Sequence, residues 1–312
     1  MELKNLCRYK KEPDFRFNVF WAEHKLLLYS EFRDGNVPAG FKQTQVLKEA
    51  TRQLPGSVKK VRVRSDTAGY EHEFLAYCDD GGDSRFGRIE FAVGCPVTMA
   101  FKNAVNEIPE DSWEIFTDSE QRNKIGQRKE WAEVCFVPNK IAKKKTGREY
   151  RYLVTREVIL EQEEIPGMEE EKEYPFPTAT MNGKKYKIFG IMTNMDWHGE
   201  KLIQWLYKRC GESEEVHRAM KEDFAGGRLP SSNLGVNAAW WWIMILALNL
   251  HAAMKLLALG EDWVTRKMKI IRFKRIHIPA HIYEKARVLI IRCTRAVGWI
   301  SEIRKKISML IV

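Results

Sequence analysis

The 312-residue sequence predicts an α/β fold in which helices and a mixed sheet are interrupted by an all-β insertion and followed by a helical C-terminal part. Strand-like and helical patterns alternate over residues 1–108, strand-like patterns dominate residues 109–192, and helical spacing dominates residues 193–260. Such alternation is typical of helices layered on a sheet. A hydrophobic share of 44% supplies a core and excludes a disordered chain.

Residues 1–108 are expected to begin the sheet domain. Runs of aromatic and branched residues predict strands, and apolar residues three or four positions apart predict helices. The expected strands cover residues 17–22, 25–32, 58–64 and 88–93, and the expected helices cover residues 42–54, 70–78 and 97–108.

Residues 109–192 are expected to form the β-rich insertion. Strand-like patterns cover residues 113–116, 131–137, 149–160 and 185–192. The lysine run at residues 143–145 and the glutamate run at residues 169–171 lie between them, and charged runs of this kind are typical of solvated loops.

A long amphipathic helix is expected over residues 199–224, because Ala225, Gly226, Gly227 and then Pro230 end the pattern. Residues 236–254 form an apolar run of nearly membrane-crossing length. Two amides and an imidazole inside it are costly in lipid, so we expect a fully buried core helix and no membrane contact. A membrane-anchored protein is the alternative. Strand-like basic stretches follow, and a last helix is expected from residue 282 to about residue 306.

Positive charge is concentrated at the C-terminal end. The formal net charge is +10, and residues 261–312 hold 13 Lys or Arg against 4 Asp or Glu, which accounts for +9. A basic segment attracts polyanions such as DNA by releasing counterions, although an ordinary basic helix has the same composition. Six cysteines without a CxxC pair, and an N-terminus without an apolar leader, predict reduced thiols in a cytoplasmic protein.

Carboxylates mark the candidate site. Asp66 follows an expected strand, and ligands gather at the carboxyl ends of strands in open α/β sheets. Tyr207, Glu214 and Lys221 are spaced by seven residues, about two helical turns, and therefore share one helix face. A carboxylate between a phenol and an ammonium suits a site that holds a metal ion and touches phosphate. An exposed helix surface with a Glu–Lys pattern is the alternative.

Longer stretches carry a resemblance to a known family. EFRDGNVPAG begins at Glu31, RVRSDTAGYEHEF at Arg62, YKIFGIMTN at Tyr186, and KRCGESEEVHRAMKEDFAGGRLPSSNLGVNAAWWWIMILALN at Lys208. Together they resemble the DDE transposases of bacterial insertion sequences, in the branch with a β-rich insertion before the glutamate-bearing helix. The resemblance spans residues 17–275 and implies an RNase H-like catalytic domain.

The resemblance also implies a chemistry. In this family two aspartates and a glutamate bind two Mg²⁺ or Mn²⁺ ions that activate the attacking oxygen and stabilise the leaving one. The context RSD identifies Asp66 as the second aspartate, and Glu214 matches the glutamate; both are expected to be catalytic metal ligands. Tyr207 and Lys221 match the positions that hold the DNA backbone. The expected partners are transposon-end and target DNA and a second subunit in a homodimer, at the nucleoid.

Two positions depart from the family pattern. Cys210 occupies the place of an expected arginine, and Arg209 lies one residue earlier, which turns a helical side chain by about 100°. Arg218, one turn beyond Glu214, is a further candidate for contact with phosphate. His277 and His281 have zinc-like spacing, but Pro279 between them favours a surface loop.

The family's first aspartate is the larger departure. It belongs to a strand that precedes the segment matching residues 17–23, and neither Asp14, beside Pro13, nor Asp34, in a turn-like segment, has strand-like surroundings. Two hypotheses follow. The chain is a DDE transposase, or it is a truncated, catalytically inactive remnant that at most binds DNA or a full-length partner.

Overall fold

The computed structural model describes residues 16–33, 37, 40–117, 129–138, 150–160, 174–294 and 297–310. Asp14, Asp34, the lysine run 143–145 and the glutamate run 169–171 lie outside these residues. The chain divides into two compact units. The sheet unit comprises Ala39–Lys48 and Leu54–Gly211, and the helical unit comprises Met1–Pro38, Glu49–Gln53 and Glu212–Val312.

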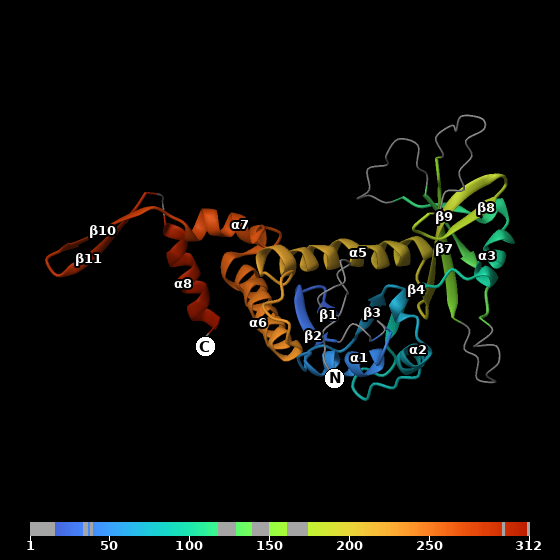
Figure 1. Ribbon diagram of the computed structural model, residues 1–312, viewed down its shortest axis with the longest axis horizontal. Helices are drawn as coiled ribbons and strands as arrows, with labels where there is room; N and C mark the ends of the chain where they lie inside the picture. The colour runs from blue at the N-terminus through green and yellow to red at the C-terminus, as the bar shows by residue number, and fades with distance from the viewer. Residues whose placement is uncertain are drawn as a thin grey trace. The chain divides into compact units, whose positions relative to one another are not determined.

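The sheet unit is built on a seven-stranded mixed sheet of order β3-β4-β9-β7-β6-β5, with β8 paired to β9. β3 and β4 are parallel, and the other pairs are antiparallel, so the expected α/β class with a mixed sheet is confirmed. β7 and β9 lie side by side in Figure 1. The strands are β3 (Arg62–Ser65), β4 (Glu90–Cys95), β5 (Glu114–Ile115), β6 (Lys129–Val134), β7 (Arg151–Val158), β8 (Thr178–Met181) and β9 (Lys184–Thr193).

Helices cover both faces of this sheet. Alternate side chains of the strands point to opposite faces, as Val154 and Leu153 of β7 do, and each set joins a different core cluster. The first cluster contains Phe74 of α2 (His72–Asp79) and Phe101 of α3 (Met99–Asn106). The second contains Leu202 of α5 (Gly199–Arg218). The remaining helix and helical turns of the unit are α1 (Gln43–Arg52, shared with the helical unit), η1 (Thr67–Gly69) and η2 (Glu110–Ser112).

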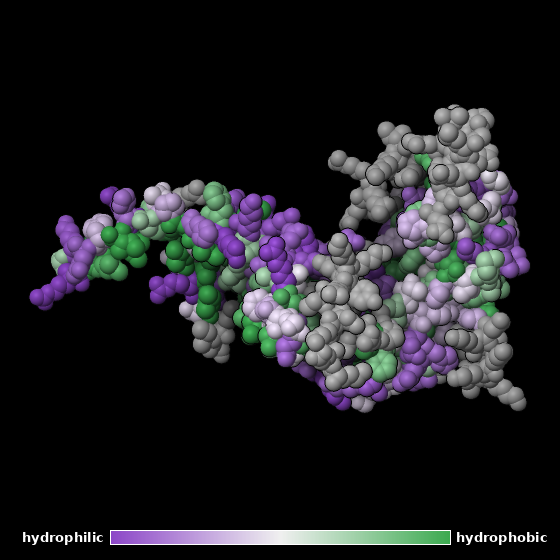
Figure 2. All heavy atoms as spheres, in the orientation of Figure 1, coloured by the Kyte–Doolittle hydropathy of each residue, from purple (hydrophilic) through white to green (hydrophobic). Residues whose placement is uncertain are grey.

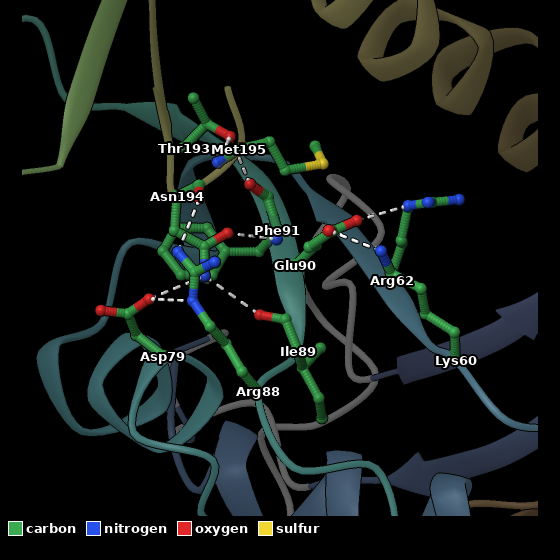
Figure 3. Close-up of polar contacts among 10 residues, drawn as sticks. All are labelled: Lys60, Arg62, Asp79, Arg88, Ile89, Glu90, Phe91, Thr193, Asn194 and Met195. Carbon is green, nitrogen blue, oxygen red and sulfur yellow. Dashed lines mark hydrogen bonds and ion pairs between the residues drawn. The ribbon is translucent and has the colours of Figure 1, made fainter. Parts of the chain in front are cut away.

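A polar cluster ties the start of β4 to the end of β9 (Figure 3). The Asn194 amide accepts a hydrogen bond from the Phe91 N–H at 2.8 Å and donates to the Ile89 carbonyl at 3.1 Å and to the Asp79 carboxylate at 3.0 Å. Arg88 donates to the Asp79 carboxylate and to the Asn194 carbonyl. The cluster provides hydrogen-bond partners for backbone groups that are not paired between the strands, namely the Phe91 N–H and the Ile89 and Asn194 carbonyls. It therefore fixes where β4 starts beside β9.

The helical unit joins the hairpin of β1 (Arg16–Trp21) and β2 (Leu26–Phe32) to α6 (Leu234–Ala253). Asn249 of α6 both accepts from the Leu27 N–H at 2.9 Å and donates to the Leu27 carbonyl at 2.8 Å. Trp241, which is fully buried, donates its indole N–H to Ser30 Oγ at 2.8 Å. Polar contacts at Leu27 and Ser30 of β2 thus hold the hairpin on the helix.

The expectation that α6 is fully buried is wrong. Trp241, Met244 and Leu248 face the core of the helical unit, whereas the side chains of Ile243 and Leu246 are 62% and 60% exposed. The amides that argued against a membrane face inward, where Asn237 bonds Ser231 and Asn249 bonds Leu27. Leu234–Leu259 is long and apolar enough to cross a membrane, so the absence of membrane contact stays a prediction.

The expected last helix from residue 282 is also wrong at its start. Two antiparallel strands occupy that region, and α8 (Gly298–Leu310) begins later. Branched side chains such as Ile282 and Ile291 favour strands, and Ala286 and Arg287 at positive φ form the two-residue turn that a tight hairpin requires. Figure 1 shows this hairpin extending from α7 and α8, and Figure 2 shows hydrophobic side chains over the hairpin and α8.

Besides the elements named above, the helical unit contains β10 (Ala280–Lys285), β11 (Val288–Cys293), α7 (Met268–Ile271), η3 (Ala219–Asp223), η4 (Met254–Leu259), η5 (Glu261–Trp263) and η6 (Arg272–Ile276).

Candidate functional site

Asp66 lies where the sequence predicted it, directly after β3 at the carboxyl end of that strand. It is the N-cap of η1, and its carboxylate accepts a hydrogen bond from the Ala68 N–H at 3.1 Å. The side chain is nevertheless 59% exposed, so most of the carboxylate surface is available to a ligand.

Two neighbours hold the Asp66 loop in place. The Gln43 side chain is buried and donates from Nε2 to the Ala68 carbonyl at 2.7 Å. Gly94 of β4 lies against the loop so closely that a Cβ there would sit 2.9 Å from the Thr67 nitrogen and 3.2 Å from the Asp66 carbonyl carbon. The absence of a side chain at Gly94 therefore allows Asp66 to follow β3 in this conformation.

Helix α5 brings two further predicted residues to Asp66. Arg209 Nη1 lies 3.8 Å from Asp66 Oδ2. The Tyr207 hydroxyl and Thr155 Oγ1 of β7 are 2.9 Å apart and share a hydrogen bond. The ammonium of Lys129 lies 4.1 Å from the Tyr207 ring centroid, within cation–π range. The Tyr207 ring is thus fixed at both its hydroxyl and its face.

These side chains line one cavity of about 320 Å³ within the sheet unit. Asp66, Tyr207 and Arg209 come from the sequence prediction. Sequence reasoning missed four polar residues of the wall, which are Lys129, Thr155, Glu157 and Lys187. The register explains the grouping, because Glu157 of β7 is paired with Lys129 of β6 on one side and with Lys187 of β9 on the other. Opposite charges side by side across strands stabilise a sheet.

The cavity carries more positive than negative charge. Three cations, Lys129, Lys187 and Arg209, line it together with two carboxylates, Asp66 and Glu157, which leaves a formal charge of +1. A cavity of this charge, with an exposed carboxylate at one wall, is suited to a phosphodiester that approaches a carboxylate-bound cation.

The other predicted residues belong to the helical unit. Glu214 is exposed near the end of α5, and Lys221 is exposed in η3. Arg218 is engaged by carboxylates of its own segment, Glu215 and Glu222 at 2.7 Å and Asp223 at 3.7 Å. These hydrogen bonds, that of Glu215 first, raise the pKa of Arg218. The side chain of Cys210 lies outside the described residues.

A divalent-metal site is not completed by the residues that the structure describes. Asp66 and Glu157 supply the hard oxygen donors that Mg²⁺ prefers, and both line the cavity. However, no group of three or more His, Cys, Asp or Glu side chains with metal-binding geometry occurs among the described residues, His277 and His281 included. The donor set seen here therefore does not fit a two-metal centre by itself.

The sheet unit is thus a three-layer α/β domain with a mixed sheet and a basic, carboxylate-containing cavity at the end of β3. Residues 178–311 match the family model described as Transposase DDE domain group 1. The match covers less than half of the chain, includes α5, and supports the resemblance to DDE transposases. A search of curated proteins gives no match to the chain.

Proposed function

We propose that this chain is an insertion-sequence DDE transposase that cuts and joins DNA at the ends of its own element. The observation that carries the proposal is the meeting of Asp66 with Tyr207 and Arg209 of α5 in one cavity, where the family match covers α5. Asp66 itself lies outside the matched residues. Its proposed role is supported by the RSD motif and by its place at the end of β3.

Each predicted residue receives a role in this proposal. Asp66 and Glu214 are carboxylate ligands of Mg²⁺ or Mn²⁺. Tyr207, Arg209 and Lys221 contact the DNA backbone, and Arg218 contacts it after exchanging a carboxylate partner. The place of Arg209 in the cavity supports its substitution for the arginine expected at position 210.

The proposal includes an RNase H-like fold for the catalytic domain. The parallel pair β3–β4, with Asp66 at the end of β3, supports this fold. We further propose that the protein works as a homodimer on chromosomal DNA, in the cytoplasm at the nucleoid. The +9 charge of residues 261–312 supports added nonspecific affinity for DNA.

An inactive, truncated remnant is the second candidate, and two observations favour it. The described residues supply no third carboxylate to Asp66 and Glu157 in the cavity. Among the described strands, β3 pairs with β4 alone, so its other edge has no strand partner. Such an edge is suited to one more strand, which is the place where the family pattern expects the first aspartate.

A nicking assay with Mg²⁺ on supercoiled DNA that carries the gene and its flanking sequence separates the two candidates. An active transposase nicks the DNA, Asp66→Asn and Glu214→Gln abolish nicking, and Asp111→Asn, an exposed aspartate outside the cavity, does not. DNA binding without nicking supports the remnant. A chain that neither binds nor nicks this DNA overturns both.

A further inference from the structure

A second cavity, of about 280 Å³, lies within the helical unit and is separate from the Asp66 cavity. The turn between β1 and β2, helix α6, η4 and the segment before α7 all contribute to its wall. Part of the wall is apolar, with Leu248, Leu256 and Val264. None of the residues of the proposed transposase site, apart from Arg218, lines it.

Basic side chains outnumber carboxylates around this cavity. Arg218 and three lysines, Lys25, Lys255 and Lys267, face two carboxylates, Glu215 and Asp223. This composition leaves a formal charge of +2. His251 adds none at neutral pH, because burial, and then the charge of Lys255, lowers its pKa to about 4.

The two carboxylates are already engaged by another residue. Glu215 and Asp223 lie 2.7 and 3.7 Å from the guanidinium of Arg218. Within the described part of the chain, Lys25, Lys255 and Lys267 have no ion pair shorter than 4.0 Å, and the polar contact of the Lys255 ammonium is the Val264 carbonyl at 3.4 Å. The three ammonium groups therefore line a hollow that can hold an anion, and Glu215, which acts on Lys255 and Lys267 from a distance, is already bonded to Arg218.

The electrostatics of Lys255 agree with this geometry. Burial lowers the pKa of Lys255, while Glu215 opposes this effect and Lys25 adds to it. An anion beside Lys255 would relieve both the cost of burial and the repulsion from Lys25. Nδ1 of His251, at the same wall, is buried without a hydrogen-bond partner among the described residues.

We propose that this cavity binds a phosphate group, held by Lys25, Lys255 and Lys267. Ammonium groups bind phosphate oxygens as strong, charge-assisted donors. The apolar wall of Leu248, Leu256 and Val264 suits the organic part of a nucleotide, so the phosphate is carried by a nucleic-acid strand or by a free nucleotide. Binding of phosphate in this cavity does not require DNA cleavage in the Asp66 cavity.

The test is a titration of the full chain, in buffer without phosphate, followed by the ring signals of His24 and His251 in NMR spectra. The probes are inorganic phosphate, a deoxynucleoside monophosphate and a single-stranded oligonucleotide. Saturable shifts with at least one probe are expected, and the double variant Lys25→Gln with Lys267→Gln weakens binding about tenfold or more. The matched control, Lys269→Gln with Lys274→Gln, removes the same charge outside the cavity and leaves the shifts unchanged.

The order of affinities identifies the source of the phosphate. Tightest binding of the oligonucleotide assigns the site to a nucleic-acid strand, and equal binding of the monophosphate assigns it to a free nucleotide. Absence of saturable shifts with all three probes overturns the proposal, as does unchanged binding by the double variant. If that variant does not fold, Lys25→Arg with Lys267→Arg keeps the charge, and loss of binding there contradicts the proposal equally.

Discussion

Single residues without charge position the charged ones in the sheet unit. Gly94 determines how closely the Asp66 loop can approach β4, and the buried Gln43 amide holds the same loop through Ala68. The Asp66 carboxylate, which we propose as a metal ligand, is thus placed by backbone contacts of its neighbours. A change at Gly94 should therefore disturb the site without removing any charged group.

We predict that Gly94→Ala destabilises the protein by about 1–3 kcal/mol, because the new Cβ would lie 2.9 Å from both the nitrogen and Oγ1 of Thr67. Urea unfolding measures the loss. Gly56→Ala is the control, since a Cβ at Gly56 meets nothing within 4 Å, and it should change stability by less than about 0.5 kcal/mol. Equal effects of the two changes would contradict the role given to Gly94.

The hydrogen bond between Tyr207 and Thr155 is a second contact of single residues that orients the site. Tyr207→Phe and Thr155→Val should each cost about 1 kcal/mol of stability, since each removes the hydrogen bond between the two hydroxyls. The double variant should cost less than the sum of the two. A double-mutant cycle on the unfolding free energy checks this, and a coupling energy near zero would show that the 2.9 Å contact does not orient the ring.

The candidate site was predictable from the sequence only in part. Asp66, Tyr207 and Arg209, which the structure places in one cavity, were named from a motif, from helical spacing and from the family pattern, and all three are local properties of the sequence. Lys129, Glu157 and Lys187 were missed because they meet through the register of three strands, which places Glu157 between the two lysines. A one-residue slip would turn these side chains to the other face, and nothing local in the sequence fixes the register.

At the scale of elements, the hairpin β1–β2 and α6 form one packing unit. The Asn249 side chain replaces a missing strand partner for Leu27, because it makes both hydrogen bonds that a neighbouring strand would offer. A polar residue in the middle of an apolar helix thus serves to dock a strand. The sequence pattern marked Asn249 as costly in a membrane but did not show its partner.

We predict that Asn249→Ala costs about 2–3 kcal/mol of stability, since it leaves the Leu27 N–H and carbonyl without partners in a half-buried setting. Hydrogen exchange of the β1 and β2 amides should accelerate more than that of β7 or β9. The control is Asn103→Ala on the exposed face of α3, which should alter neither quantity. Uniform acceleration in both units would contradict a local docking role.

The predictions for α6 and for the β10–β11 region were wrong because each sequence pattern is compatible with two structures. Periodicity alone does not distinguish an apolar helix with an exposed stripe from a fully buried one, and α6 has such a stripe. In the C-terminal region, Ala286 and Arg287 adopt the positive φ values of a tight turn, although neither is a residue that favours them. The hairpin β10–β11 was therefore read as the start of a helix.

At the scale of the whole molecule, each unit has its own core and its own cavity, so properties of the two can be measured separately. The sheet unit holds its buried thiols in a protonated state, since burial raises the pKa of Cys78 and Cys95 to about 12. The helical unit instead contains a half-buried histidine, whose pKa is lowered to about 4. That group is His251, which packs edge-on against Phe224 at 5.4 Å between ring centroids.

Acidification should destabilise the helical unit through His251. Burial lowers its pKa to about 4 in the folded chain, while the unfolded chain has the ordinary value of about 6.5. Between these values the unfolded state binds more protons, so stability falls as the pH drops from about 6.5 to about 4. Because the ring is only half-buried, we expect a loss of about 1–2 kcal/mol rather than the full value of the shift.

The effect of His251 on stability can be distinguished from the effect of the ion-paired carboxylates by the pH range in which each acts. The hydrogen bonds of Arg218 lower the pKa of Glu215, and those of Arg156 lower that of Glu110, so both carboxylates lose their contribution only below their ordinary values near 4.5. Urea unfolding at about pH 7 and about pH 5 therefore reports mainly on histidine. His251→Gln should remove most of the difference between the two pH values, whereas His277→Gln, at an exposed site, should keep it. If both variants retain the wild-type difference, the acid sensitivity resides elsewhere and His251 is not the responsible group.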